Sequence, residues 1–528
     1  MSGGVAVEAL DRLRASAERR KDSTATRVVV QQGHCSQSVG AAAVVEAFSD
    51  ALPDDARLVV AGCDGACFDA PVVTVTDPAG ETRRFSRVTA EAAGAILGGS
   101  APHADDTTKE FFAGQRRLTL DLCGELDATD LDDYMIHGGY RGLANALDAT
   151  PEGVIEQVKA SGLRGRGGAY FPAGVKWESA RAGGGSPRYL VVNAEEGEPG
   201  IFKDRHLMEG VPHRLVEGAI IAAYASGVDE AYVYINAEAN LSAERMRQSI
   251  DQAYAIGLLG DDILGSGYNL KVSVQRGAGG YVCGEETTLL NTMEGYRREP
   301  RLRPPFPTVS GLWARPTVIN NAETLASVPF IMADGAGAFS DIGTDDAKGT
   351  KIISLSGSVR RPGLAEVPMG TTLRQIVLDI GGGPHEGHTL AALAVGGPSS
   401  GLLPLSMFDT PILPGLLHDS GVMLGAGGVI AIDERVGVLD VVRGLAAYNA
   451  AESCGKCTPC REGTPRMVAV VDRLMSGQGS ASDLDELSNL AEVVNSASLC
   501  GLGQAAGNPI TSALHFFGDE LRSLAGVT

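Results

Sequence analysis

The spacing of apolar residues along the chain predicts four structural units. In the first, over residues 1–100, β-branched runs at 26–33 and 56–63 have the length and composition of strands. Residues 41–52 instead repeat their apolar positions with a helical period. Strands and helices in this order favour a small thioredoxin-like domain.

The same alternation recurs on a larger scale over residues 110–335. Apolar runs at 188–195, 230–237 and 269–276 predict strands, and the long apolar stretch at 215–228 predicts a helix between two of them. Strands that alternate with helices are typical of an α/β sheet. We therefore expect a Rossmann-like α/β domain in this part of the chain.

Two smaller units follow. Residues 350–430 contain short apolar runs separated by Gly-Pro turns, which predict a β-grasp-like domain. Residues 435–528 carry helical periodicity at 438–453, 467–475 and 483–496, which predicts a helical bundle. The expected fold class is therefore multidomain α/β.

Composition restricts the setting of the protein. The 528 residues carry a net charge of −21, which argues against a surface for nucleic acid or anionic membrane. No apolar run reaches the roughly 18 residues that a membrane-spanning helix requires. The first residues also lack the apolar segment of a secretory signal. We therefore expect a cytoplasmic protein with no direct membrane insertion and no nucleic-acid partner.

Three of the nine cysteines stand three positions apart: Cys454, Cys457 and Cys460. This spacing suits three corners of a [4Fe–4S] cluster, whose iron prefers thiolate ligands. The fourth ligand that we expect is Cys500, the one cysteine that follows them. A four-cysteine zinc site is the alternative, although such sites usually pair two Cys-x2-Cys hooks. Cysteines without any metal are a third interpretation.

Glycine accounts for 69 of the 528 residues, and two blocks are rich in it. The first block is residues 161–177, and the second, residues 275–295, opens into an expected helix. Glycine lets the backbone approach a phosphate or a flat ring closely, and a helix N-terminus offers free N–H groups to a phosphate. Arg166 and Lys176 would add positive charge. The blocks predict a nucleotide or flavin phosphate site, and glycines that merely serve turns are the alternative.

Several motifs occur in an order that resembles one known family. They are LRGRGGAYFPAGVKW, NAEEGEPG with FKDRH, RGAGGYVCGEET, PRLRPPFP, INNAETLA and ESCGKCTPCREG. Residues 110–528 thereby resemble the NADH-oxidising, 51-kDa-type flavoprotein subunit of respiratory complex I, which has relatives in NAD-dependent molybdenum formate dehydrogenases and NAD-reducing hydrogenases. The resemblance implies FMN and NAD(H) in the α/β domain, an SLBB-type middle domain and one [4Fe–4S] cluster in the bundle. It also implies hydride exchange between NAD(H) and FMN, followed by single-electron transfer through the cluster.

The resemblance assigns individual residues to the expected site. Glu198 and Glu286, on the nicotinamide side, are the candidate catalytic residues, and a solvated loop charge is the alternative for each. Phe171 and Phe306 would stack on the nucleotide, and Glu285 would bond its ribose. The phosphate cradle and the surroundings of the flavin would be formed by Gly165, Arg166, Gly167, Gly168, Lys176, Asn193, Glu195, Gly284, Asn320 and Asn321.

Three positions depart from the family pattern. Glu195 stands where aspartate is common, Tyr170 where glycine is common, and Arg303 where lysine is common. Arginine preserves the charge of lysine but not its shape. None of the three removes the expected site, and each could shift its affinity or the potential of the flavin.

The first hundred residues resemble a thioredoxin-like [2Fe–2S] domain, in which two cysteine pairs hold the cluster. Cys35, Cys63 and Cys67 match three of the four ligands, but Gly40 stands at the position of the second. Three thiolates do not complete the usual set, so we expect no [2Fe–2S] cluster in this domain. A cluster completed by a substitute ligand is the alternative.

The order of domains, with SLCGLGQ around the fourth cysteine and no ferredoxin-like tail, most resembles the β subunit of an NAD-dependent molybdenum formate dehydrogenase. The partners then implied are a thioredoxin-like [2Fe–2S] small subunit and a molybdenum/iron–sulfur catalytic subunit. The alternatives are the diaphorase subunit of an NAD-reducing hydrogenase and the NADH-dehydrogenase subunit of a complex I-like enzyme. A non-catalytic electron-transfer scaffold is a hypothesis of another class.

Overall fold

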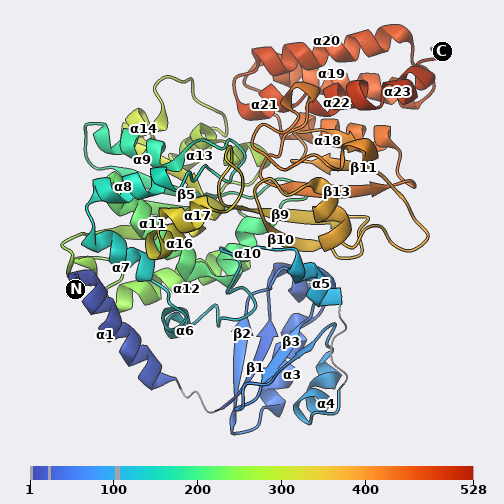
Figure 1. Ribbon diagram of the computed structural model, residues 1–528. Coiled ribbons are helices and arrows are strands. Elements are labelled where there is room, and N and C mark those ends of the chain that lie inside the picture. Colours follow the sequence, from blue (N-terminus) through green and yellow to red (C-terminus); the bar gives the residue numbers. More distant parts are fainter. Residues whose placement is uncertain (1–3, 22–24, 102–106, 527–528) are drawn as a thin grey trace.

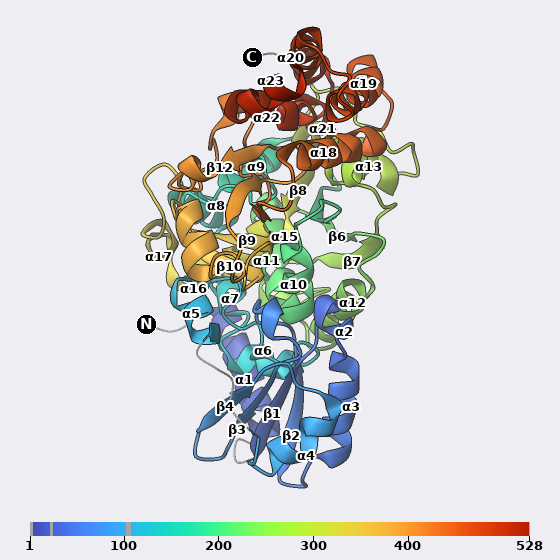
Figure 2. The same cartoon turned by 90° about the vertical axis from the view of Figure 1, so that its right-hand side faces the viewer.

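The computed structural model describes residues 4–21, 25–101 and 107–526. Over these residues the chain forms a multidomain α/β structure with a four-stranded mixed sheet, a four-stranded parallel sheet and a five-stranded mixed sheet. Figures 1 and 2 show the first sheet and the last helices at opposite ends of the molecule, with the other two sheets between them. Within the described ranges, no helix is long and apolar enough to span a bilayer.

The first sheet and its helices occupy residues 26–97. The elements are β1 (Thr26–Gln31), α2 (His34–Gln37), α3 (Ala41–Ala51), β2 (Ala56–Ala61), β3 (Val73–Thr76), β4 (Thr82–Phe85) and α4 (Ala93–Leu97). The sheet order is β2-β1-β3-β4, with β1 parallel to β2 and antiparallel to β3. Val28 and Val30 of β1 pack with Phe48 of α3, so the alternating apolar residues of the strand form the core.

Helix α1 (Val5–Arg20) lies against the second domain instead of the first sheet (Figure 1). It packs on α7 (Arg141–Asp148), and the carboxylate of Asp148 accepts hydrogen bonds from the N–H groups of Ala6 and Val7 at 3.0 and 3.1 Å. A carboxylate at a helix N-terminus satisfies free N–H groups and complements the helix dipole. The predicted first domain, residues 1–100, therefore includes a helix, α1, that packs with the larger domain instead.

The second sheet is fully parallel. Its strands are β5 (Tyr189–Ala194), β6 (Glu230–Ile235), β7 (Lys271–Arg276) and β8 (Thr317–Asn321). The order is β7-β6-β5-β8, so the chain runs from β5 to β6 and β7 on one side and then returns to β8 on the other side of β5. In open α/β sheets a ligand crevice forms where the strand order reverses, outside the carboxyl ends of the strands. Here that point lies between β5 and β8.

Helices cover this sheet and carry the glycine-rich loops. Helix α11 (Pro212–Ser226) is buried along almost its whole length and ends at Gly227, whose φ of 68° suits glycine at a helix C-terminus. The other helices used below are α8 (Pro151–Ala160), α9 (Ala173–Ala182), α10 (Lys203–Gly210), α12 (Asn240–Ala255), the 3₁₀ turn η4 (Tyr281–Gly284), α13 (Glu286–Met293) and α15 (Ala322–Ala326).

The third sheet and the last helices complete the chain. The strands are β9 (Thr350–Gly357), β10 (Gly363–Pro368), β11 (Leu390–Val395), β12 (Leu402–Pro404) and β13 (Gly428–Asp433), in the order β10-β9-β13-β11-β12. Strand β13 is parallel to β9, whereas the other neighbours are antiparallel. The helices are α18 (Val438–Glu452), α19 (Thr458–Met475), α20 (Ala481–Ala497), α21 (Gly501–Ala505), α22 (Asn508–Phe516) and α23 (Gly518–Leu524).

Helix α18 joins the last helices to the parallel-sheet domain. The hydroxyl of Tyr448 donates to the carbonyl of Gly197 at 2.7 Å, and the carboxylate of Glu452 accepts from the N–H of Tyr281 at 2.8 Å. Gly197 lies in the loop after β5, and Tyr281 lies in the segment after β7. The bundle is therefore held directly beside the crevice.

Candidate functional site

Three asparagines line the carboxyl ends of β5 and β8. The Asn193 amide donates to the carbonyl of Gly284 at 2.8 Å, and the Asn320 side chain accepts from the indole N–H of Trp177 at 2.8 Å. The side-chain oxygen of Asn321 caps α15 by accepting from the N–H of Glu323 at 3.1 Å. These bonds bring residues of separate motifs together at the crevice that the strand order predicts.

The first glycine block forms a closed loop between α8 and α9. The N–H of Gly165 donates to the carbonyl of Phe171 at 2.9 Å, which closes the loop. Gly168 has a φ of 114°, a conformation that few other residues adopt. A Cβ at Gly167 would lie 3.0 Å from the Cβ of Asn321, so glycine allows the loop to press on the end of β8.

Arg166 contacts the backbone of its own loop and of a distant segment. Its side chain is buried, and its guanidinium donates to the carbonyls of Arg164, Lys348 and Thr350 at 2.7–2.9 Å. All three guanidinium nitrogens are therefore engaged with the backbone, where they tie the glycine loop to the start of β9. These three bonds use three of the five guanidinium N–H groups, and a contact of Arg166 with a phosphate stays a prediction.

Lys176 retains a position at the crevice. Its ammonium donates to the carbonyl of Ile319 at 2.9 Å, lies 4.0 Å from the carboxylate of Glu286 and sits 5.9 Å from the ring of Phe171. Burial lowers the pKa of Lys176, and Glu286 opposes that shift. The side chain of Phe171 is 51% exposed, and that of Phe306, which follows the second block in sequence, is 56% exposed. These aromatic faces are available to stack on a ligand.

Two glutamates after β5 have raised pKa values. Burial raises the pKa of Glu195 to about 7, although the Asn236 amide donates to its Oε1 at 2.6 Å and lowers it. The other oxygen, Oε2, is buried and has no hydrogen-bond partner among the described residues. Burial also raises the pKa of Glu198 to about 8, against the opposing charge of Lys203. A buried oxygen without a partner is costly, and a donor on a bound ligand would satisfy it.

The second glycine block ends at two neighbouring glutamates with different contacts. Glu285 caps α13, because its Oε2 accepts from the N–H groups of Thr287 and Thr288 at 3.0 and 2.9 Å. Glu286 instead accepts from the guanidinium of Arg303 at 2.8 Å and is only half-buried. The structure thus commits one Glu285 oxygen to the helix, a role that the motif alone did not reveal.

A buried ion network supports the crevice and was missed by the sequence analysis. The ammonium groups of Lys203 and Lys351 lie 3.0 and 2.6 Å from the carboxylate of Glu323, and Asp204 pairs with Lys203 at 2.7 Å. All four side chains are buried. Asn321 is held in turn, since its amide donates to Asp204 at 2.7 Å. Lys203, Asp204 and Glu323 fall inside the quoted motifs, whereas Lys351 comes from β9 and could be found only in three dimensions.

The four predicted cluster ligands gather against η4. Cys454 and Cys457 follow α18, Cys460 lies in the first turn of α19, and Cys500 precedes α21. All four belong to one cluster with Val282 and Leu502. A tetrahedral zinc ion at about 2.3 Å would hold its sulfurs about 3.8 Å apart. Among the described residues, however, the one group of three ligand atoms within 4.8 Å of one another lies elsewhere in the molecule. The four cysteine sulfurs are therefore spread more widely than the ligands of one zinc ion. This spread suits the separate corners of an iron–sulfur cubane.

The residues present therefore fit both cofactors. The crevice offers an unsatisfied buried carboxylate oxygen, glycine backbone and exposed aromatic rings, as a flavin and a nucleotide require. The four thiols offer the soft ligand set of an iron–sulfur cluster. Together they define a flavin- and iron–sulfur-binding oxidoreductase subunit.

Comparison with known proteins agrees with this class. Residues 158–330 match the Nuo51 FMN-binding domain, residues 352–403 the SLBB domain, and residues 440–524 the NADH-ubiquinone oxidoreductase-F iron-sulfur binding region. The chain is 45% identical over 406 residues to the HndC subunit of the NADP-reducing hydrogenase of Solidesulfovibrio fructosivorans, a match that covers 77% of this chain and 83% of that protein. It is 46% identical over 391 residues to the F 2 subunit of the NADH-quinone oxidoreductase of Rhizobium meliloti strain 1021, a match that covers 74% of this chain and 93% of that protein.

A solved structure shares the fold over nearly the whole chain. A chain in the crystal structure of NAD+-reducing [NiFe]-hydrogenase in the air-oxidised state superimposes with a TM-score of 0.68 at 28% identity, covering 98% of this chain and 90% of that one. The protein therefore belongs to the family of 51-kDa-type, NADH-oxidising flavoprotein subunits, with an FMN-binding domain and a 4Fe–4S-binding region. This confirms the family resemblance and the cofactors FMN, NAD(H) and [4Fe–4S]. The closeness to formate dehydrogenase stays a prediction.

The contrast between Glu285 and Glu286 predicts different effects of the same substitution. Glu286→Gln should weaken NADH binding about 10-fold or more, since a hydrogen bond to a charged group contributes roughly 1.5–3 kcal/mol. Glu285→Gln should change NADH affinity little, because one of its oxygens caps α13. Titration of each variant with NADH, with FMN content measured in parallel, checks this. Equal losses in both variants, or loss of FMN from Glu286→Gln, would contradict the assignment.

Proposed function

We propose that this chain exchanges electrons between NAD(H) and a partner subunit, with Glu198 and Glu286 as the residues that engage the nucleotide. When bound, the two cofactors supply the conversion between a two-electron exchange with nicotinamide and one-electron transfer. The residues of the chain bind, orient and enclose them. Membership of the NADH-oxidising flavoprotein family supports the reaction.

The single observation that carries the proposal is the position of η4. Gly284, at its end, accepts the hydrogen bond from Asn193 in the crevice. Val282, two residues earlier, packs with Cys460 and Cys500. One short turn therefore lines both sites, which favours direct electron transfer between a flavin in the crevice and a cluster on the four cysteines.

The remaining predicted residues receive roles consistent with these contacts. Gly165, Gly167, Gly168 and Lys176 would form the phosphate cradle, in which Gly165 closes the loop through the carbonyl of Phe171. Asn193, Glu195, Gly284, Asn320 and Asn321 would surround the flavin, and Phe171 and Phe306 would stack on the nucleotide. Arg166 would stabilise the glycine loop through its hydrogen bonds to backbone carbonyls, and Glu285 would cap α13. The four cysteines Cys454, Cys457, Cys460 and Cys500 would hold the cluster.

The domains also receive their proposed types here. The sheet order β2-β1-β3-β4, with one parallel and two antiparallel neighbours, supports a thioredoxin-like first domain. The β9–β13 sheet, in which the first and last strands are parallel neighbours, supports the β-grasp-like, SLBB-type domain. The parallel sheet supports the Rossmann-like domain, and α18–α23 the helical bundle.

Three assemblies are consistent with such a subunit. In the first, a molybdenum/iron–sulfur subunit oxidises formate and a thioredoxin-like [2Fe–2S] subunit completes a cytoplasmic complex. In the second, the partner is a hydrogenase, as the names of one relative and of one solved structure indicate for those proteins. In the third, the chain is the NADH-dehydrogenase subunit of a complex I-like enzyme, as the names of further relatives indicate for those proteins. All three assign the same NAD(H) exchange to this chain.

The native assembly decides between them. The complex should be purified through a tag on this chain and supplied with NAD+ and either formate or hydrogen. Formate-dependent NAD+ reduction supports the molybdenum partner, and hydrogen-dependent reduction supports the hydrogenase. Reduction by neither, together with NADH-dependent reduction of a quinone, supports the complex I-like enzyme. The isolated chain should oxidise neither formate nor hydrogen, because the proposal assigns both of those oxidations to a partner subunit. Formate oxidation by the isolated chain would contradict the division of labour.

A further inference from the structure

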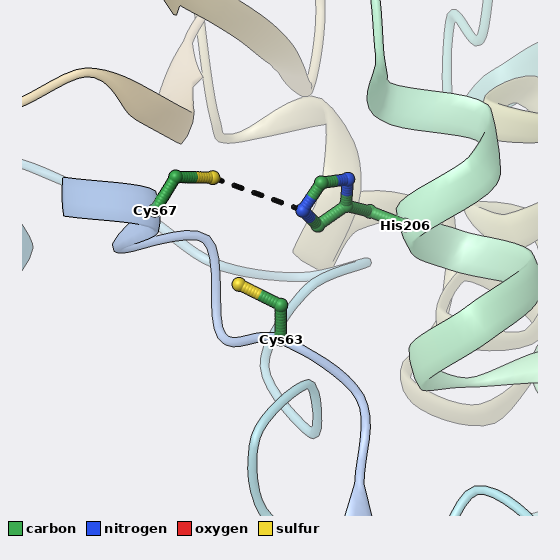
Figure 3. A group of neighbouring side chains, drawn as sticks. All are labelled: Cys63, Cys67 and His206. Atoms are coloured by element: carbon green, nitrogen blue, oxygen red, sulfur yellow. Dashed lines mark hydrogen bonds between the residues drawn. The ribbon is translucent and has the colours of Figure 1, made fainter. Parts of the chain in front are cut away.

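Two thiols and an imidazole meet where the first sheet joins α10. The Sγ atoms of Cys63 and Cys67 and a ring nitrogen of His206 lie within 4.8 Å of one another. The Cys67 Sγ is 3.9 Å from the His206 Nε2, and Figure 3 shows the three side chains directed into the same space. Across residues 4–21, 25–101 and 107–526, this is the one group of three potential metal-ligand residues packed so closely.

The backbone explains why the two domains meet so closely here. Cys63 follows β2, and Cys67 begins a 3₁₀ turn (Cys67–Asp69). Between β2 and Cys63, Gly62 presses on α10: a Cβ at Gly62 would lie 2.2 Å from the Cα of Gly210. Only glycine allows this contact, and it brings the thiols of the first domain next to His206 of the second.

The histidine is oriented as a metal ligand. Its Nδ1 lies 2.7 Å from the carbonyl oxygen of Phe202. A carbonyl accepts only, so Nδ1 carries the hydrogen, and in the neutral ring the lone pair is then on Nε2, which is the atom nearest the thiols. Metal-binding histidines commonly have their second nitrogen fixed in this way. His206 and Cys63 are 4% and 8% exposed, so the ligand atoms are largely shielded from water.

We propose that Cys63, Cys67 and His206 bind a single zinc-type divalent ion that fastens the first domain to α10. Two thiolates and a neutral imidazole are ligands that Zn²⁺ prefers, and two negative charges balance the ion. A tetrahedral ion with Zn–S of about 2.3 Å and Zn–N of about 2.0–2.1 Å holds S and N about 3.6 Å apart. The 3.9 Å separation therefore needs only a small adjustment.

The same residues do not fit a [2Fe–2S] cluster. Such a cluster takes four ligands, two on each iron, and Gly40 stands at one of the four expected positions. Its φ of 94° is left-handed, which glycine adopts freely and cysteine rarely. Cys35 is exposed on α2 and lies outside the close group. The proposed site thus has three protein ligands and an open fourth position for water, as some zinc sites do.

The ion would act on a helix that also serves the crevice. His206 lies on α10 three residues after Lys203 and two after Asp204, and these two residues hold Asn321 through hydrogen bonds of 3.1 and 2.7 Å. Fixing His206 therefore restrains the same part of α10 that supports the flavin crevice. This role concerns position, and the proposal does not depend on the partner of the chain.

The test is metal analysis of the full chain that carries FMN and its cluster. After dialysis against a mild chelator, we expect about one zinc per chain. Cys67→Ser and His206→Gln should lower bound zinc at least 10-fold, with FMN and cluster iron unchanged. Cys35→Ser and Cys123→Ser are matched controls, because Cys35 is a neighbouring thiol outside the group and Cys123 is buried in another core. Both should retain the zinc.

Cobalt provides a readout that needs no variant. Co²⁺ added to the metal-depleted, unmutated chain should give thiolate-to-cobalt charge-transfer bands and the visible bands of a tetrahedral ion. Absence of both zinc and these bands would overturn the proposal. So would zinc retention in both Cys67→Ser and His206→Gln, or loss of zinc from Cys35→Ser. A second iron–sulfur EPR signal that disappears in Cys67→Ser would show a [2Fe–2S] cluster in place of the single ion.

Discussion

Replacement of Cys500 by alanine should abolish the [4Fe–4S] cluster and leave FMN bound. Cys500 is the one predicted ligand that lies far from the Cys-x2-Cys-x2-Cys run, and α20 and the turn before α21 return it to the other three. Three thiolates leave one iron without its protein ligand, and even changes around a metal ligand weaken binding by about 10–100-fold. The loss of a ligand itself should exceed that effect. The crevice is built from other elements, so its flavin should remain.

Iron, acid-labile sulfide and flavin should be measured on the same sample. Cys283→Ala is the matched control, because Cys283 is buried in η4 beside Val282 and donates to the carbonyl of Gly279 at 3.2 Å. That variant should keep the full cluster. An unaltered cubane in Cys500→Ala would remove Cys500 from the ligand set.

Replacement of Glu323 by glutamine should destabilise the parallel-sheet domain by about 3–5 kcal/mol, the range for breaking a buried ion pair. The amide removes the negative charge that pairs with both ammonium groups. Its single oxygen also cannot replace both carboxylate oxygens, which accept from Lys351 at 2.6 Å and from the N–H of Ile352 at 2.9 Å. Burial alone would raise the pKa of Glu323, but Lys351 and Lys203 lower it overall. Because the folded pKa is depressed, the stabilisation is present at neutral pH and is lost as pH falls through that pKa.

Thermal and denaturant unfolding of this domain, with FMN release as the measured signal, should show the effect. The control is Glu152→Gln, which breaks a surface pair with Arg181 at 2.7 Å. Exposed pairs contribute little, so its unfolding midpoint should not move. The pH scan adds a second check, since the difference between wild type and Glu323→Gln should shrink in acid. Equal midpoints at neutral pH would show that the buried network does not stabilise the domain.

The sequence was most informative where local pattern and chemistry coincide. The run Cys454–Cys460 indicated a cluster because its spacing alone brings thiols to one turn, and Asn193, Asn320 and Asn321 fell where strands end. The carbonyl partners of Arg166 on a distant segment could not be predicted, although its charge was visible. The motif likewise did not reveal that Glu285 caps α13.

Some features of the structure depend on contacts between residues far apart in the chain, which the sequence does not reveal. Helix α1 was grouped with the first domain by its position, yet its apolar face packs on α7. Lys351 completes the ion network from a strand of another sheet. His206 stood in a quoted motif, but its two thiol neighbours are about 140 residues earlier in the chain. No local period or spacing connects such positions.

The most direct measurement for the central claim is NADH oxidation by the purified chain with FMN and cluster bound and ferricyanide as the acceptor. Anaerobic NADH should first bleach the flavin absorbance, and ferricyanide should then sustain turnover without any partner subunit. Glu286→Gln should require more NADH for the same bleaching, whereas Cys500→Ala should still bleach. A chain that binds FMN yet neither bleaches nor oxidises NADH would be the non-catalytic scaffold and would contradict the proposed exchange of electrons with NAD(H).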